Sequence, residues 1–152
     1  MRPDLPTGVV TLLFTDIEGS TRLLADLRGR YVDALAEHRR LVREAARAHG
    51  GVEVDTQGDS FLIAFPRPSG AVSAAVAAQL ALRDGPITVR IGIHTGEPEL
   101  TDEGYVGLDV HRGARIGDAG HGGQILLSAA THARVDVATV DLGEHHPAPV
   151  LG

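Results

Sequence analysis

Residues 9–21 read Val-Val-Thr-Leu-Leu-Phe-Thr-Asp-Ile-Glu-Gly-Ser-Thr, and this stretch decides the fold. Its first seven residues, Val9 to Thr15, are continuously apolar or β-branched, which is typical of a strand buried on both faces. Gly19, Ser20 and Thr21 then supply a turn and a helix N-cap. The stretch therefore predicts a central strand that runs directly into a helix, with Asp16 close to the junction.

Further elements follow from the spacing of apolar residues on either side of glycine and proline. From Thr21 to Gly50, helical spacing predicts either one long helix or two helices joined near Gly29. A β-hairpin with Asp59 at its tip comes next. Further along, after the strand expected at 87–94, a loop of mixed acidic and glycine character runs to about Gly104. The remaining elements are expected as strands at 87–94, 124–127 and 137–142 and as helices at 69–82, 108–116 and 129–134.

Helices and strands alternate in this order except at the one central hairpin. The pattern predicts an α+β fold with a ferredoxin-like βαββαβ core and added elements. A chain of 152 residues is the size of a single domain. We expect this domain over residues 1–143, with 144–152 as a tail or a truncated end of it.

Composition excludes several classes of function. The chain has no cysteine, which rules out disulfides, thiolate metal sites and cysteine nucleophiles. All 14 basic residues are arginine, so a P-loop lysine and a Schiff-base lysine are excluded as well. A net charge of −6 disfavours nucleic acid as a partner, and no apolar run is long enough to span a bilayer. We expect a cytoplasmic protein without membrane contact by this segment.

Two carboxylates are candidate metal ligands. Asp16, at the end of a buried strand and before a Gly-Ser-Thr turn, suits a cation bound to a polyphosphate, with the helix N-terminus facing the anion. The alternative is that Asp16 or Ser20 only caps the helix. If the hairpin lies beside the first strand, Asp59 reaches the same cation; alternatively, it is a plain turn residue. Two such carboxylates repel unless a divalent ion lies between them, which points to Mg²⁺ or Mn²⁺.

His111 and Arg115 form the third candidate group. They are four residues apart, so on a helix they share one face and offer two donors suited to phosphate oxygens. A solvated basic helix face is the alternative reading of this pair.

Four motifs in order resemble the class III nucleotidyl cyclases, the adenylate and guanylate cyclases. They are Phe14 to Thr21, Gly58-Asp59, Arg90 to Gly96, and Tyr105-Val106-Gly107 followed by Arg115. The resemblance covers roughly Val9 to Leu142. It is strongest to the cyclase homology domains at the front of large bacterial signalling ATPases and transcription regulators.

The resemblance implies a role for each matching residue. Asp16, Asp59 and the backbone carbonyl of Ile17 would bind two Mg²⁺ or Mn²⁺ ions, and Arg115 would stabilise the transition state. Six positions would bind the nucleotide. Its phosphates would be contacted by Gly19, Ser20, Thr21 and Arg90, and its base would be selected by Asp55 and Gly104. In the family these groups come from two subunits, which implies a homodimer with two shared sites.

The chain also departs from the family pattern. Asp55 stands where adenylate cyclases carry a base-selecting lysine, Gly104 has no side chain to read a base, and His111 replaces the transition-state asparagine. A second phosphate-binding lysine is absent. The expected function is conversion of ATP or GTP to the 3′,5′-cyclic monophosphate and pyrophosphate in signal transduction. The alternative is a catalytically degenerate domain that senses nucleotide or dimerises as a regulatory module.

Overall fold

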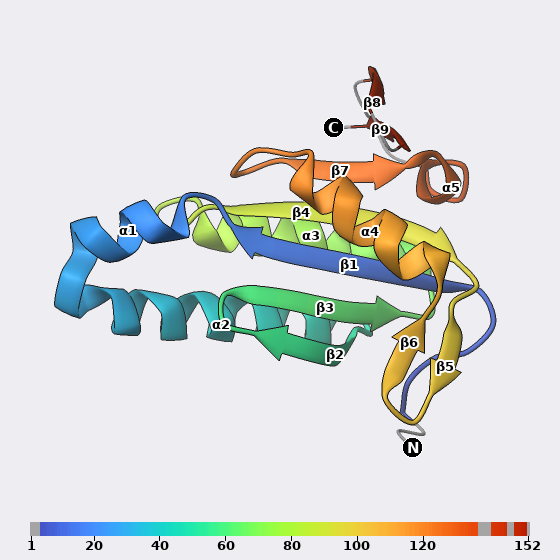
Figure 1. Ribbon diagram of the computed structural model, residues 1–152, viewed down its shortest axis with the longest axis horizontal. Coiled ribbons are helices and arrows are strands. Elements are labelled where there is room, and N and C mark those ends of the chain that lie inside the picture. Colours follow the sequence, from blue (N-terminus) through green and yellow to red (C-terminus); the bar gives the residue numbers. More distant parts are fainter. Residues whose placement is uncertain (1–3, 137–140, 146–147, 152) are drawn as a thin grey trace.

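A computed structural model describes residues 4–136, 141–145 and 148–151 of the chain. Its elements form one seven-stranded sheet with helices on both faces and a small two-stranded sheet at one end (Figure 1). In chain order they are β1 (Val10–Ile17), α1 (Ser20–Leu27), the 3₁₀ turn η1 (Arg28–Arg30), α2 (Tyr31–Ala48), β2 (Val52–Gln57), β3 (Ser60–Phe65), α3 (Pro68–Leu82), β4 (Val89–Gly96), β5 (Glu99–Thr101), β6 (Gly104–Val106), α4 (Leu108–Asp118), β7 (Ile125–Ser128), α5 (Ala129–His132), β8 (Asp141–His145) and β9 (Ala148–Leu151).

Strand β1 is an interior strand of the large sheet, whose order is β2-β3-β1-β4-β7-β9-β8. It pairs antiparallel with both β3 and β4, while β4 and β7 run parallel. The register places Asp16 opposite Arg90 and Thr15 opposite Phe61. The α+β class and the ferredoxin-like arrangement are therefore confirmed, with β7 to β9 as added strands.

Alternate residues of β1 face two different helical layers. Leu13 and Ile17 belong to the main core, which α2 and α3 cover from one side of the sheet. Leu12 and Phe14 belong to a second cluster on the opposite side, where α4 lies across β1 and β4 (Figure 1). Burial on both faces explains why the strand is continuously apolar.

Helix α4 approaches the sheet closely because glycines occupy the contact. A Cβ atom on Gly92 of β4 would lie 2.3 Å from the backbone nitrogen of Gly117, and one on Gly113 would lie 2.3 Å from the Phe14 ring. Backbone atoms thus meet where side chains ordinarily keep elements apart. The close approach fixes the position of α4 relative to β1 and β4.

Most expected elements are confirmed, and one open alternative is resolved. The stretch after the first strand forms two helices, α1 and α2, joined by η1 around Gly29. Strand β4 begins at Val89 and not at residue 87, and α4 continues to Asp118, beyond the expected end at Ile116.

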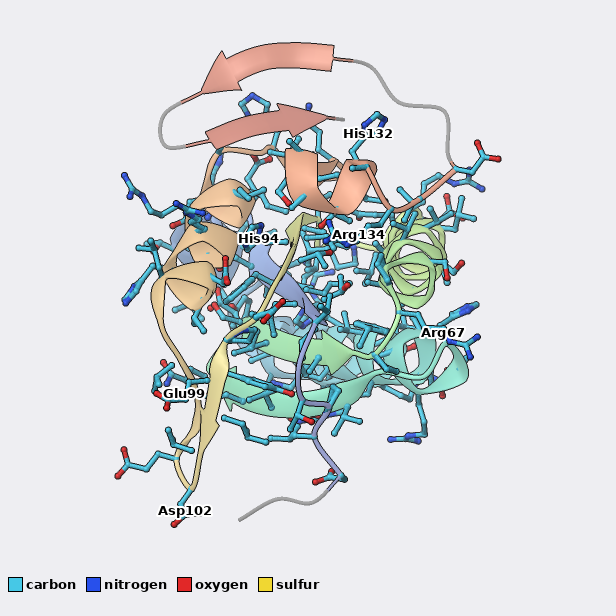
Figure 2. All side chains as sticks on the ribbon, turned by 90° about the vertical axis from the view of Figure 1, so that its right-hand side faces the viewer. Arg67, His94, Glu99, Asp102, His132 and Arg134 are labelled. Atoms are coloured by element: carbon cyan, nitrogen blue, oxygen red, sulfur yellow. The ribbon has the colours of Figure 1, made fainter. Side chains whose placement is uncertain are left out.

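The prediction of a loop up to Gly104 is wrong. This segment contains the hairpin of β5 and β6, on which Figure 2 labels Glu99 and Asp102. Each strand has only three residues, too few for an alternating pattern to show in the sequence. The hairpin is held by Tyr105, which packs in the second cluster and donates a hydrogen bond from its hydroxyl to the Pro6 carbonyl at 2.5 Å.

The end of the chain is described only in part. Of the strand expected over 137–142, residues 137–140 lie outside the described residues, and β8 begins at Asp141. Strand β9 pairs antiparallel with both β7 and β8. The boundary expected at residue 143 stays a prediction. Among the described residues, none of the helices has the length and apolar character needed to cross a membrane.

Candidate active site

Asp16 is the focus of the polar groups at the end of β1. The side chain of Arg90, its neighbour on β4, forms an ion pair with its Oδ2 atom, and Ser60 donates to its Oδ1 atom at 3.3 Å. Helix α1 begins after Gly19, which is itself the N-cap in a left-handed conformation, so neither Asp16 nor Ser20 caps the helix. The capping alternative for Asp16 is therefore wrong.

Two adjoining cavities lie beside Asp16. The first, of about 170 Å³, is bounded by Asp16, Ser60 and Arg90 and by Ala114 and Asp118 of α4. The second, of about 180 Å³, is lined by Asp55 and Gln57 of β2 together with residues of β3. Three residues line both: Phe14, Ser60 and Phe61. The candidate metal ligand Asp16 and the candidate base-selecting Asp55 thus open onto neighbouring hollows.

The turn that carries Asp59 is held next to Asp16. Ser60, which follows Asp59, supplies the hydrogen bond to Asp16. Gly58 has a φ of 60°, a conformation that favours glycine, and its carbonyl accepts a hydrogen bond from the Arg39 side chain of α2. The expectation that the hairpin lies beside the first strand is confirmed, which brings Asp59 to the edge where Asp16 lies.

His38 of α2 packs beneath this turn, with its ring 5.9 Å from that of Phe61. Burial lowers the pKa of His38 because desolvation disfavours the charged imidazole, while the Leu35 carbonyl and the negative charge of Asp59 oppose the lowering. A neutral, buried imidazole thus supports the hairpin from below. The sequence offered no signal that this histidine would be buried, since it lies among charged residues.

The chain leaves the sheet after Ile17, the last residue of β1, and turns at Glu18 and Gly19 into α1. The Ile17 side chain is buried in the core, and the backbone N–H of Glu18 donates to the Thr88 carbonyl at 3.0 Å. Ser20 and Thr21 form the first residues of α1, with Thr21 exposed. The candidate phosphate-binding turn is thus at the surface, next to Asp16.

His111 and Arg115 lie on α4, the helix whose Ala114 and Asp118 bound the first cavity. Gly113 and Gly117 of α4 face the sheet, and both His111 and Arg115 are exposed. Neither residue lines the two cavities described above. A single copy of the chain therefore places Asp16, Arg90 and Asp55 on the two cavities. Asp59 lies on the neighbouring turn and, like His111 and Arg115, lines neither cavity.

Gly104 opens strand β6 and lies against β2. A Cβ atom at this position would be 3.8 Å from the side chain of Val54, the neighbour of Asp55. The two candidate base-selecting positions are therefore close in space. Gly104 has a φ of 109°, which residues with side chains rarely adopt, so its backbone conformation itself favours glycine.

The donor set around Asp16 fits a divalent ion that is shared with a nucleotide. Among the described residues, no three His, Asp or Glu side chains gather as a complete metal cage. Mg²⁺ is commonly bound by one or two carboxylates, with waters and substrate phosphates completing its coordination. Asp16, Asp59 and the Ile17 carbonyl are oxygen donors of this kind.

Sequence reasoning missed two residues of this site. Ser60 links β3 to Asp16. Asp118 lines the first cavity, and its carbonyl accepts from Arg90 at 3.5 Å. Ser60 could have been found from the hairpin pairing, since it precedes the residue opposite Thr15. No sequence signal marks Asp118.

Comparison with known proteins finds one matching family model and several similar sequences and structures. The sequence model of the adenylate and guanylate cyclase catalytic domain matches residues 4–152. An uncharacterised protein of Mycobacterium tuberculosis is 45% identical over 148 residues, which cover 92% of this chain and 52% of that protein. The chain thus spans about half the length of this relative.

Named cyclases are also similar. The adenylate cyclase of Lachancea kluyveri is 32% identical over 162 residues, covering 85% of this chain and 9% of that enzyme. A structure of an adenylate cyclase from Trypanosoma brucei in its monomeric state superposes with a TM-score of 0.87 at 30% identity, covering 99% of this chain and 90% of that one. The expected resemblance in both sequence and fold is confirmed.

Proposed function

The chain belongs to the adenylate and guanylate cyclase catalytic domain family, and on this premise we propose that it converts a purine nucleoside triphosphate, ATP or GTP, into the 3′,5′-cyclic monophosphate and pyrophosphate in signal transduction. The observation that carries the proposal is the pair of adjoining cavities, one lined by Asp16 and Arg90 and the other by Asp55. Together they offer a cation-binding and phosphate-binding end next to a polar end suited to a base.

The reaction joins the ribose 3′ oxygen to the α-phosphorus and breaks the bond from that phosphorus to the β-phosphate oxygen, so pyrophosphate leaves. Asp16, Asp59 and the Ile17 carbonyl would hold two Mg²⁺ or Mn²⁺ ions. When bound, these ions promote ionisation of the 3′ hydroxyl and neutralise charge on the phosphates. Arg90 and the turn over Gly19, Ser20 and Thr21 bind the phosphates in this arrangement.

Beyond this, catalysis requires that the reacting groups be positioned and that positive charge face the phosphates. Arg115 stabilises the charge that develops on the attacked phosphoryl group, and His111 donates a hydrogen bond from the same helix face. In the family the transition-state residues come from the second subunit, and in this proposal His111 and Arg115 likewise act on a nucleotide held by another copy of the chain. Their exposure and their absence from both cavities support this arrangement. The active form is thus a homodimer with two shared sites.

Specificity for the base rests on Asp55 and on the backbone of Gly104. A carboxylate accepts hydrogen bonds, so Asp55 suits an exocyclic amine or the N1–H group of guanine. Gly104 contributes no side chain and adopts a backbone conformation that disfavours one. Both ATP and GTP therefore remain candidate substrates.

A regulatory module without turnover is the second candidate function. The observations that favour it are His111 in place of the family's asparagine and the absence of any lysine. Such a domain would keep nucleotide binding through Asp16 and Arg90 and lose the chemical step.

The shared site predicts that two inactive variants restore each other. Asp16→Ala and Arg115→Ala should each lower turnover by about a thousandfold, since each removes charge that acts in the transition state. Mixed in equal amounts and allowed to exchange subunits, they should recover about a quarter of wild-type activity, because half of the dimers then hold one complete site of two. The measurement is cyclic nucleotide formation by the mixture.

The matched control mixes Asp16→Ala with the double variant Asp16→Ala/Arg115→Ala, which cannot assemble a complete site. If the first mixture stays as inactive as its components while the wild-type protein turns over, the site is not shared between two copies.

A further inference from the structure

A chain of buried polar side chains runs from α4 across β4 to β1, away from the cavities beside Asp16. One of its members is His94 of β4, which Figure 2 labels beside α4 and which contacts both Asp109 and Ser128. Successive hydrogen bonds join Asp109 to His94 at 2.7 Å, His94 to Ser128 at 2.9 Å, Ser128 to Thr131 at 3.2 Å, Thr131 to Thr95 at 2.9 Å and Thr95 to Thr11 at 3.0 Å.

Both oxygens of the Asp109 carboxylate accept hydrogen bonds. Burial works to raise the pKa of Asp109, but the hydrogen bonds from His94 and the Glu97 N–H, together with the positive charges of His94 and Arg112, hold that pKa below its usual range. Ionised Asp109 only accepts, so the His94 Nε2 atom donates to it. The Nδ1 atom of His94 lies 2.9 Å from the Ser128 hydroxyl, so both ring nitrogens have a hydrogen-bond partner.

The order Asp109, His94, Ser128 resembles that of a hydrolase triad, but it lacks access for a substrate. His94 and Ser128 are only 5% and 4% exposed. The Ser128 hydroxyl also caps α5 by accepting from the Thr131 N–H at 3.2 Å. The group is therefore a structural connection and not a nucleophilic centre.

Asp109 fastens the first turn of α4 to the end of β4. Its Oδ1 atom accepts from His94, and its Oδ2 atom accepts from the Glu97 N–H at 3.0 Å. The carboxylate fits only because residue 96 is glycine, since a Cβ atom there would lie 2.2 Å from it. At the other end of the helix, Gly117 contacts Gly92 through backbone atoms.

These two contacts set both the position and the rotation of α4. Successive residues of a helix are about 100° apart around its axis, so the direction in which Asp109 points also determines where His111 and Arg115 point. Loss of the carboxylate would leave the Gly92 and Gly117 contact in place but release the first turn. The exposed residues on the helix would then lose their fixed orientation.

We propose that His94 and Asp109 are positioning residues, which hold the first turn of α4 on β4 so that His111 and Arg115 face a nucleotide bound by another copy. This inference rests on the proposed cyclase function. It predicts that the pair affects the chemical step while nucleotide binding at Asp16 and Arg90 is unchanged.

The test compares Asp109→Ala and Asp109→Asn with the wild-type protein at a temperature where all are folded. Asp109→Ala should lower kcat by about ten- to a hundredfold, the usual effect of a small misplacement, with KM within about twofold. Asp109→Asn keeps the shape and an acceptor for His94, so its kcat should return to within about fivefold of wild type. Amide hydrogen exchange at Glu97 and in the first turn of α4 should rise about tenfold in Asp109→Ala.

Thr11→Val is the matched control. It removes a buried hydroxyl at the far end of the same chain, so it should reduce stability without changing kcat or exchange in α4. An equal fall of kcat in Thr11→Val, or an unchanged kcat in Asp109→Ala, would overturn the proposal. If the wild-type protein makes no cyclic product, the proposed function fails. In that case amide hydrogen exchange decides whether His94 and Asp109 hold α4. Unchanged amide exchange in Asp109→Ala would refute that role.

Discussion

Asp16→Ala is expected to abolish the stabilisation of this protein by Mn²⁺ together with a nucleoside triphosphate. In the wild-type protein, ligand at about 100 times its Kd should add about 2.7 kcal/mol to the free energy of unfolding. In a chain of this size that corresponds to a rise in melting temperature of roughly 5–10 °C. Asp16 lines the first cavity and makes both contacts that define it, with Ser60 and Arg90. The measurement is thermal unfolding with and without ligand.

Asp26→Ala provides the control for charge. It removes one carboxylate from α1, as Asp16→Ala does from β1, but Asp26 is exposed and its 3.9 Å ion pair with Arg22 lies at the surface. Its thermal shift with ligand should equal that of the wild-type protein. A full shift in Asp16→Ala would contradict the assignment of Asp16 as the metal ligand.

Gly92→Ala is expected to destabilise the folded chain by about 3 kcal/mol, near the upper end of the usual cost of overpacking. The added methyl group would lie 2.3 Å from the nitrogen and 2.5 Å from the Cα atom of Gly117. Backbone atoms cannot move aside as a flexible side chain can, so α4 must lift from β4. Urea unfolding at 25 °C measures the loss directly.

Gly29→Ala is the comparison for this substitution. Its Cβ atom would meet no other atom within 4 Å, so the free energy of unfolding should change by less than about 1 kcal/mol. Equal stabilities for Gly92→Ala and the wild-type protein would show that α4 does not rest on β4 as closely as described.

Much of the fold could be predicted because its elements have distinct patterns. The continuous apolar run of β1 reflects helices on both faces of the sheet, and the turn chemistry around Gly58 identifies the hairpin of β2 and β3. The hairpin of β5 and β6 could not be predicted, since its strands are three residues long and depend on the tertiary contact of Tyr105.

The packing of the helices was harder to predict from the sequence. Helix α3 buries Val72 and Leu82 together with several alanines. Its Val76 and Leu80 are 44% and 56% exposed, so the large apolar residues lie on more than one face and do not mark the buried one. In α4 the spacing of Gly113 and Gly117 is a readable sign of close approach, but the partner strand is known only from the structure.

The candidate site was predictable where it follows a motif. Asp16, Asp59 and Arg90 lie at one edge of the sheet because β1 pairs with both β3 and β4, as the element order suggested. The link between His94 and Asp109 joins residues 15 apart on two elements. His94 lies within the motif from Arg90 to Gly96, but no sequence pattern pairs it with Asp109, so only the structure reveals the link. The roles of the site residues in catalysis stay predictions.

The most direct test of the cyclase function is a mass-spectrometric assay for cyclic product. Purified protein is incubated with Mn²⁺ and, separately, with ATP, GTP, CTP or UTP, and Asp16→Ala serves as the control for contaminating activity. We expect 3′,5′-cyclic nucleotide and pyrophosphate from ATP or GTP, and none from the variant. No cyclic product from any of the four nucleotides, with the protein folded and dimeric, would contradict the cyclase activity and favour the regulatory module in its place.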